Sequence, residues 1–141
     1  MHPTPPATAD SIRAMTADEI IVRVPAASRY VATVRVTSAS LAAELDFSVD
    51  EIEELTMGVN ELVAVLIDVA EPDVEPWLDL VYRLDGDTLE ILATLTGPGE
   101  GDLGSAEVEV DALATQILGA VVDEHELAGR SGRILKRRDR A

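Results

Sequence analysis

The sequence contains no cysteine, and this absence excludes both a disulfide framework and thiol chemistry. It fits a protein of the reducing cytoplasm. Histidine is nearly as scarce: His2 and His125 are the only two, which argues against a histidine-based metal site but not against one made of carboxylates. Aromatic residues make up 3% of the chain, so we expect a core of Val, Leu, Ile and Ala.

Long apolar runs are also missing, since none reaches the ~18 residues of a membrane span. The opening MHPTPPATADSIRAM lacks a basic start followed by an apolar run, so we expect no secretory signal and no membrane partner. Its composition predicts a disordered arm over residues 1–17. Residues 18–136 suit one domain, followed by a basic tail at 137–141. We expect a cytoplasmic protein.

Basic residues are few, 11 against 27 Asp and Glu, which gives a net charge of −16. Six of the 11 lie at Arg130 or later, so residues 1–129 carry five basic and 26 acidic residues, a net −21. Such a body repels nucleic acid phosphates and attracts a basic protein surface, unless the charge serves solubility alone. The basic end is either a solvated end or a nucleic-acid patch, and the acidic body argues against the patch.

The first half of the chain predicts one strand and two helices. Residues 19–24 are short and β-branched, which favours a strand, and the apolar spacing of residues 27–45 favours a helix. Ser48 and Glu51 match the Ser-x-x-Glu capping box that begins a helix. An apolar stripe for the core follows on this helix: Ile52, Leu55, Val59, Leu62, Val63, Leu66 and Ala70. The opposite face carries Met57, Glu61, Val65 and Asp68.

The second half predicts two hairpins and a third helix. Strands at 77–84 and 88–95 are joined by Asp-Gly-Asp, a strong hairpin signal. A glycine-rich loop over 96–107 precedes a helix with an apolar face, and a last short hairpin passes through Gly129 and Gly132. The order β, α, α, β, β, loop, α, β, β predicts a two-layer α/β sandwich, with helices on one face of a mixed, mostly antiparallel sheet.

Residues 24–62 read VPAASRYVATVRVTSASLAAELDFSVDEIEELTMGVNEL. They contain an arginine-bearing helix, then Phe47, the run DEIEEL at 50–55, and Val-Asn-Glu at 59–61. This pattern resembles the anti-sigma-factor and switch-protein serine kinases of the GHKL (histidine kinase-like) ATPase superfamily. The resemblance extends over nearly the whole ordered chain and is strong to about Glu61 and weaker after it. It implies the GHKL, or Bergerat-type, fold.

The resemblance implies an ATP site made of three boxes. In the first, a Glu acts as general base and an Asn four residues later binds Mg²⁺. This chain keeps the base as Glu61, but Val65 occupies the Asn position and has no oxygen for a hard cation. Asn60 points about 100° away from Glu61 on a helix, so it is a poor substitute. Glu61 is therefore either a catalytic residue or a solvated helix glutamate.

The second box, Asp-x-Gly-x-Gly, binds adenine through its Asp. Here the segment is Leu95-Thr96-Gly97-Pro98-Gly99, so leucine replaces the adenine contact and Thr96 compensates only in part. The third box is a glycine-rich turn that holds phosphate at the start of the third helix. Asp111, Ala112 and Ala114 occupy its positions. An earlier run of glycines is either an anion cradle or the remnant of a flexible lid: Gly97, Gly99, Gly101 and Gly104.

Three losses in three boxes lead us to expect an anti-sigma-factor-like regulator that binds proteins, without ATP turnover and without a cofactor or metal. The resemblance implies a sigma factor, an anti-anti-sigma antagonist and a second copy of the chain as partners. The acidic body leads us to expect no direct nucleic acid contact. The alternative is an ATP-dependent protein-serine kinase that uses Glu61, ATP and Mg²⁺. A third possibility is a subunit that keeps only the fold. Met57 and Val65 either form an apolar contact centre or pack under the loop at 96–107.

Overall fold

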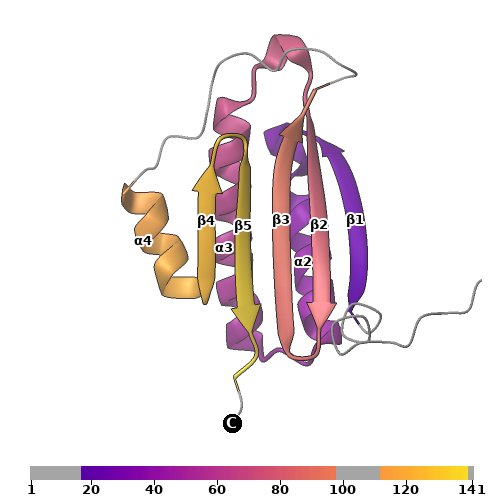
Figure 1. The fold of residues 1–141 in the computed structure, drawn as a ribbon, viewed down its shortest axis with the longest axis vertical. Coiled ribbons are helices and arrows are strands. Elements are labelled where there is room, and N and C mark those ends of the chain that lie inside the picture. Colours follow the sequence, from indigo (N-terminus) through magenta and orange to yellow (C-terminus); the bar gives the residue numbers. More distant parts are fainter. Residues whose placement is uncertain (1–16, 98–111, 140–141) are drawn as a thin grey trace, which may run out of the picture.

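The computed structural model describes residues 17–97 and 112–139 (Figure 1). Its elements are β1 (Asp18–Pro25), the short 3-10 helix η1 (Ser28–Tyr30), α2 (Val31–Glu44), α3 (Val49–Val69), η2 (Pro72–Val74), β2 (Trp77–Asp85), β3 (Thr88–Thr96), α4 (Ala112–Val121), β4 (Glu124–Ala128) and β5 (Ser131–Arg137). The strands form one sheet in the order β1-β2-β3-β5-β4. Every neighbouring pair of these strands is antiparallel.

The helices α2 and α3 run along one face of the sheet, and α4 packs against α3 beside β4 (Figure 1). This arrangement confirms the two-layer α/β sandwich with its helices on one face. Alternation along each strand explains it: in β2 and β3 every second residue is buried under the helices. The opposite face of the sheet has no helix over it in the part of the chain that the structure describes.

The apolar stripe of α3 forms the centre of the core. Five of its members are completely buried, namely Leu55, Val59, Leu62, Val63 and Leu66. Ile52 and Ala70 are partly buried and pack at its edge. The predicted helix phase is therefore confirmed.

The capping box at the start of α3 is also confirmed. The backbone N–H of Glu51 donates to Ser48 Oγ (3.1 Å), and the Ser48 N–H donates to Glu51 Oε1 (2.7 Å). These two bonds satisfy donors that would otherwise be free at the first turn of the helix. A second carboxylate oxygen of Glu51 accepts from the Asp139 N–H at 2.6 Å, so the end of the described chain is bound to the start of α3.

The two predicted hairpins are present, with one correction. The first turns through Gly86, whose φ is +62°, as expected of an Asp-Gly connection. The second turns at Gly129, but Gly132 lies within β5 and not in the turn. A Cβ atom at Gly132 would overlap the side chains of Leu62 and Leu127, so glycine allows α3 to approach the sheet closely.

Three of the basic residues after Arg130 are part of the sheet and pair with carboxylates of the fold. β5 lies between β3 and β4, and its cations pair with carboxylates of the same fold. Arg133 Nε lies 2.8 Å from Glu90, and Lys136 Nζ lies 2.9 Å from Glu54. Arg137, the last residue of β5, lies 2.7 Å from Glu124. The sequence pattern placed these charges in a separate region because the partners lie far away along the chain.

Candidate functional site

The residues of the first box lie on the flank of α3 that faces α4. Gly58 on this flank lies against Val121 and Val122 at the end of α4, and Val65 follows it two turns later. Glu61 is half-buried, and within residues 17–97 and 112–139 its carboxylate has no ion pair. Val65 packs against the core cluster. A carboxylate and an apolar side chain thus occupy this flank.

Asn60 does not take over the role of the missing metal ligand. Its side-chain oxygen is buried and finds no hydrogen-bond partner among the described residues. On a helix Asn60 is displaced from its neighbour Glu61 by about 100°, so the two side chains leave α3 on different flanks. The amide oxygen is therefore not placed beside the Glu61 carboxylate.

Leu95, at the adenine position of the second box, is part of the core. It is 4% exposed, and its backbone N–H donates to the Arg130 carbonyl at 2.9 Å. An aspartate at this position would present an acceptor to adenine. The leucine side chain instead fills space between the layers and offers no hydrogen bond.

The hydroxyl of Thr96 is bound within the sheet. Its hydroxyl donates to Asp79 Oδ2 at 2.8 Å. Asp79 also accepts two hydrogen bonds from Arg23, at 2.6 and 3.0 Å, and these bonds are the main reason that the pKa of its carboxyl lies below the usual range. The Thr96 hydroxyl therefore belongs to a network with β1 and β2, and the expectation that it replaces the adenine contact in part stays a prediction.

The glycine run falls mostly outside the described residues. Gly97 is half-exposed and follows directly after β3. Gly99, Gly101 and Gly104 lie outside the described residues, as does Asp111 of the third box. Ala112 begins α4 and is exposed, whereas Ala114 is buried. The anion cradle at these glycines stays a prediction.

Chemically, the first two boxes hold one carboxylate, Glu61 of α3, and two apolar side chains, Val65 of α3 and Leu95 of β3. Glu61 can accept a proton from a hydroxyl group placed beside it. Val65 and Leu95 supply no oxygen atom, and Mg²⁺ requires oxygen ligands. The described residues at the first two boxes therefore offer one carboxylate, and Val65 and Leu95 offer neither a metal ligand nor a hydrogen-bond acceptor for adenine.

A second feature, which the sequence reading did not locate, is an acidic helix surface. α3 contains six Asp and Glu residues and no basic residue, and α2 contains only Arg35 as a cation. Four carboxylates of these helices are exposed and define the surface: Glu44, Asp50, Glu53 and Asp68. Met57 on α3 is 54% exposed. Val65 is half-buried and packs against the core, and the apolar contact centre of Met57 and Val65 stays a prediction.

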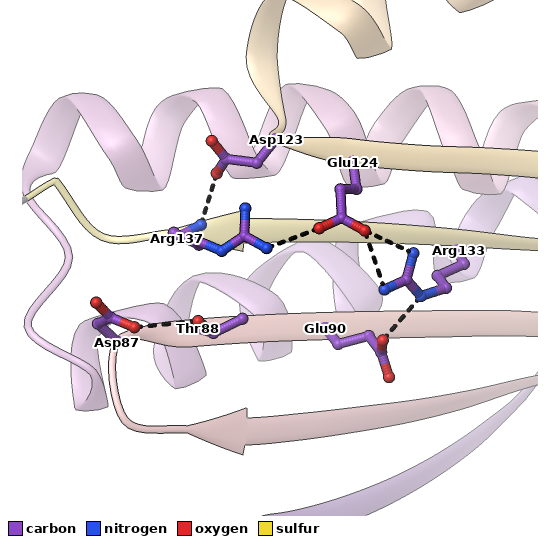
Figure 2. Close-up of polar contacts among 7 residues, drawn as sticks. All are labelled: Asp87, Thr88, Glu90, Asp123, Glu124, Arg133 and Arg137. Atoms are coloured by element: carbon purple, nitrogen blue, oxygen red, sulfur yellow. Dashed lines mark hydrogen bonds and ion pairs between the residues drawn. The ribbon is translucent and has the colours of Figure 1, made fainter.

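The opposite side of the molecule is ionically balanced. Figure 2 shows Arg133 between Glu90 of β3 and Glu124 of β4, with Arg137 bound to the other side of Glu124. These side chains lie in front of the strands, while the helices lie behind. The hydrogen bonds from Arg137 and Arg133 hold the pKa of Glu124 below its usual range. The positive and negative charges of this face therefore offset one another locally.

Comparison with known proteins gives relatives in sequence. No protein-family model matches the chain. It is 30% identical over 80 residues to the serine-protein kinase RsbW of Bacillus cereus (strain B4264), which covers 57% of this chain and 50% of that protein. It is also 28% identical to the serine-protein kinase RsbW of Bacillus mycoides (strain KBAB4), again over 80 residues that cover 57% of this chain and 50% of that protein. The chain thus spans about half the length of the curated relatives it matches.

A solved structure supports the same likeness. The fold is similar to the RsbU and RsbW domains of a Mycobacterium tuberculosis protein, with a TM-score of 0.63 and 16% identity over 88% of this chain and 33% of that one. The resemblance noted at residues 24–62 is therefore confirmed, and the chain has the RsbW-like α/β fold. None of the helices in the described ranges is long and apolar enough to cross a membrane.

Proposed function

We propose that this protein is a regulator that acts by binding other proteins, in the manner of an anti-sigma factor, without turning over ATP. The observation that carries the second half of the proposal is the burial of Leu95 in the core. A nucleotide base needs a polar acceptor at that place, and a buried leucine supplies none. Val65 adds to the argument because it removes the oxygen that would hold Mg²⁺.

The acidic helix surface supports the first half. Three exposed carboxylates of α3, at Asp50, Glu53 and Asp68, and one of α2, at Glu44, create a negative field over one side of the molecule. A partner with basic helices is attracted by such a field and associates faster. Sigma factors carry basic helices that contact DNA, so an alternative sigma factor is the partner we propose. The other partners that we propose are an anti-anti-sigma antagonist and a second copy of this chain.

The other candidate is an ATP-dependent serine kinase that phosphorylates the antagonist. Its support is Glu61, a half-buried carboxylate on the flank of α3 that faces α4. The curated relatives are named serine-protein kinases, which agrees with this candidate. It requires a nucleotide to be held without the adenine acceptor and without the Asn ligand. We therefore place it second.

The experiment is a capture from the native host followed by reconstitution. The immobilised protein should retain a sigma factor, and the purified pair should form a complex that blocks transcription from promoters of that factor, with and without ATP. Glu53→Lys reverses one exposed charge of the acidic helix surface and should weaken the complex. Asp85→Lys makes the same change at the β2–β3 turn and is the matched control. A complex that forms only with ATP, or transfers phosphate to an antagonist, would favour the kinase.

A further inference from the structure

A pocket of about 580 Å³ lies at the edge of the sheet where β1 ends and β2 begins, and we call it the β1–β2 pocket. Figure 1 shows both strand ends at this edge, near the start of α2 and the end of α3. Seven of the ten residues that line the pocket have apolar side chains, and the other three are Ser28, Arg29 and Glu75. A pocket of this size with mainly apolar walls and a few polar groups is the usual build of a small-molecule site.

The β1–β2 pocket is separate from the three nucleotide boxes. None of the residues that line it occupies a box position. The end of α3 contributes Ile67 and Ala70 to its wall. Ile67 follows Val65 by two positions, so it is displaced by about 200° around the helix axis. The pocket and the flank with Glu61 therefore lie on different sides of α3, and a ligand in the pocket does not depend on the losses at the boxes.

Backbone hydrogen bonds hold the walls of the pocket in place. The Ala26 N–H donates to the carbonyl of Pro76 at 3.0 Å, and the Ala27 N–H donates to the carbonyl of Pro25 at 2.8 Å. Glu75, directly before the buried Pro76, has a φ of +50°, which is uncommon for a residue with a side chain. Such conformations persist only where the surrounding structure enforces them, and they are concentrated at functional sites. The pocket is therefore already formed without a ligand.

The pocket carries one positive and one negative charge, and neither has an ionic partner within residues 17–97 and 112–139. Arg29 is exposed, and its guanidinium lies 5.0 Å from the centre of the Tyr30 ring. Glu75 is exposed as well, and no ion pair joins it to Arg29. The nearby Arg23 is already engaged, since it lies over the Trp77 ring at 5.6 Å and pairs with a carboxylate of β2. A ligand thus meets one available cation and one available carboxylate.

We propose that the β1–β2 pocket binds a free α-amino acid with a large apolar side chain. Its carboxylate pairs with the Arg29 guanidinium, and its ammonium group pairs with the Glu75 carboxylate. The apolar side chain of the ligand lies against the walls, where its burial supplies the hydrophobic part of the affinity. A ligand with a single charge leaves either Arg29 or Glu75 without a partner and is therefore bound more weakly.

The test is titration of the full chain with three probes that share a phenyl group and differ in charge. L-phenylalanine carries both charges, 2-phenylethylamine carries only the ammonium group, and 3-phenylpropionate carries only the carboxylate. Trp77 lines the pocket and is the only tryptophan of the chain, so its fluorescence reports binding directly. L-phenylalanine should change the Trp77 emission in a saturable manner, and each singly charged probe should bind at least about tenfold more weakly.

Two charge variants assign the contacts. Arg29→Gln and Glu75→Gln should each raise the dissociation constant of L-phenylalanine at least about tenfold. Arg29→Gln should leave the binding of 2-phenylethylamine unchanged, and Glu75→Gln should leave that of 3-phenylpropionate unchanged. The matched controls are Arg83→Gln, at the other end of β2, and Glu71→Gln, in the same connection as Glu75. Both controls are exposed and lie outside the pocket, so neither should affect any probe.

A third variant fills the pocket. Ala27 lines it with an extended backbone, so Ala27→Leu introduces no strain in the main chain and should abolish the binding of all three probes. Circular dichroism checks that the variants are folded. A wild type whose Trp77 emission does not respond to millimolar L-phenylalanine overturns the inference. So do equal affinities for the three probes, or an effect of Glu71→Gln as large as that of Glu75→Gln. These results leave sigma-factor binding untouched.

Discussion

The ammonium nitrogen of Lys136 lies 2.9 Å from Oε2 of Glu54. The same nitrogen donates to the carbonyl oxygen of Val121, 2.8 Å away, at the last residue of α4. Lys136 is buried on β5, and Glu54 belongs to α3. One cation thus connects the sheet with two helices, and it does so at a helix C-terminus, where the helix dipole favours positive charge.

Replacing this cation should destabilise the fold. Lys136→Met keeps much of the side-chain volume but leaves the Val121 carbonyl without its donor, and we expect a loss of about 1–3 kcal/mol. Glu54→Gln keeps an acceptor for Lys136 at a site that is nearly half exposed, so it should cost under about 1 kcal/mol. Urea unfolding of the three proteins measures both values. A larger loss for Glu54→Gln than for Lys136→Met contradicts this account.

Truncation of the α3 stripe should have a larger effect. Leu62 is completely buried, so Leu62→Ala should lower the free energy of unfolding by about 2–5 kcal/mol, and Val59→Ala should also destabilise clearly. Met57→Ala is the control on the same helix, because Met57 is largely exposed, and it should change stability by less than about 0.5 kcal/mol. The melting temperatures of these variants, measured by thermal unfolding, test the prediction. Unchanged melting temperatures for the Leu62 and Val59 variants would mean that the stripe does not face the core.

The Glu51 cap predicts a dependence on pH. Burial raises the pKa of the Glu51 carboxyl, but hydrogen bonds from the N–H groups of Ser48 and Asp139 outweigh it, so its pKa lies below the ordinary value. A lowered folded-state pKa stabilises the protein above the unfolded pKa of about 4.3, and this stability is lost as pH falls through the folded value. The difference in unfolding free energy between wild type and Glu51→Gln should be constant near neutral pH and shrink in acid. A difference that grows in acid would mean that the pKa of Glu51 is raised in the folded protein, which contradicts this account.

Nucleotide binding tests the losses at Val65 and Leu95. Calorimetric titration with Mg-ATP should show no Mg-dependent binding at physiological concentrations, because neither side chain offers the oxygen that the ligand needs. Micromolar affinity would contradict this expectation and favour the kinase. In that event Glu61→Gln should abolish phosphate transfer and leave ATP affinity largely unchanged, as expected of a general base.

Added salt should slow the association with a basic partner. The Debye length is already ~8 Å at physiological salt, so the steered part of the association rate with a captured sigma factor should fall as salt rises. The dissociation rate, which depends on contacts at the interface centre, should change little. Both rates are read from surface-binding traces over a salt series. An association rate that is flat across the series would mean that the acidic charge serves solubility alone.

The local patterns of the sequence predicted most of the fold. The capping box, the apolar stripe of α3 and the Asp-Gly hairpin each depend on residues within a few turns of one another, and all three were correct. The errors concern long-range pairing. Arg133 and Glu90 are 43 residues apart, and Arg23 and Asp79 are 56 apart, so no local pattern reveals that these charges offset one another. The basic end therefore looked separate from the body.

The candidate site was predictable only where the resemblance fixed a position. Glu61 and Val65 could be assigned because the helix phase orders them on one flank. The hydrogen bond from Thr96 to Asp79 could not be predicted, because it depends on how β2 and β3 pair and on which face of the sheet carries the Thr96 hydroxyl. The acidic helix surface was visible as composition but not as a location. The location of these charges depends on how the helices pack against the sheet.

Gly132 has a consequence for the gene. Every missense change of a glycine codon adds a Cβ atom, and at position 132 that atom would meet the side chains of Leu62 and Leu127. At Gly119 the added atom would meet only His125 at an ordinary contact distance of 3.9 Å. Neutral drift can therefore replace Gly119 with alanine. A substitution at residue 132 requires the Leu62 and Leu127 side chains to move, so variants at this codon should be less stable than variants at the codon for residue 119.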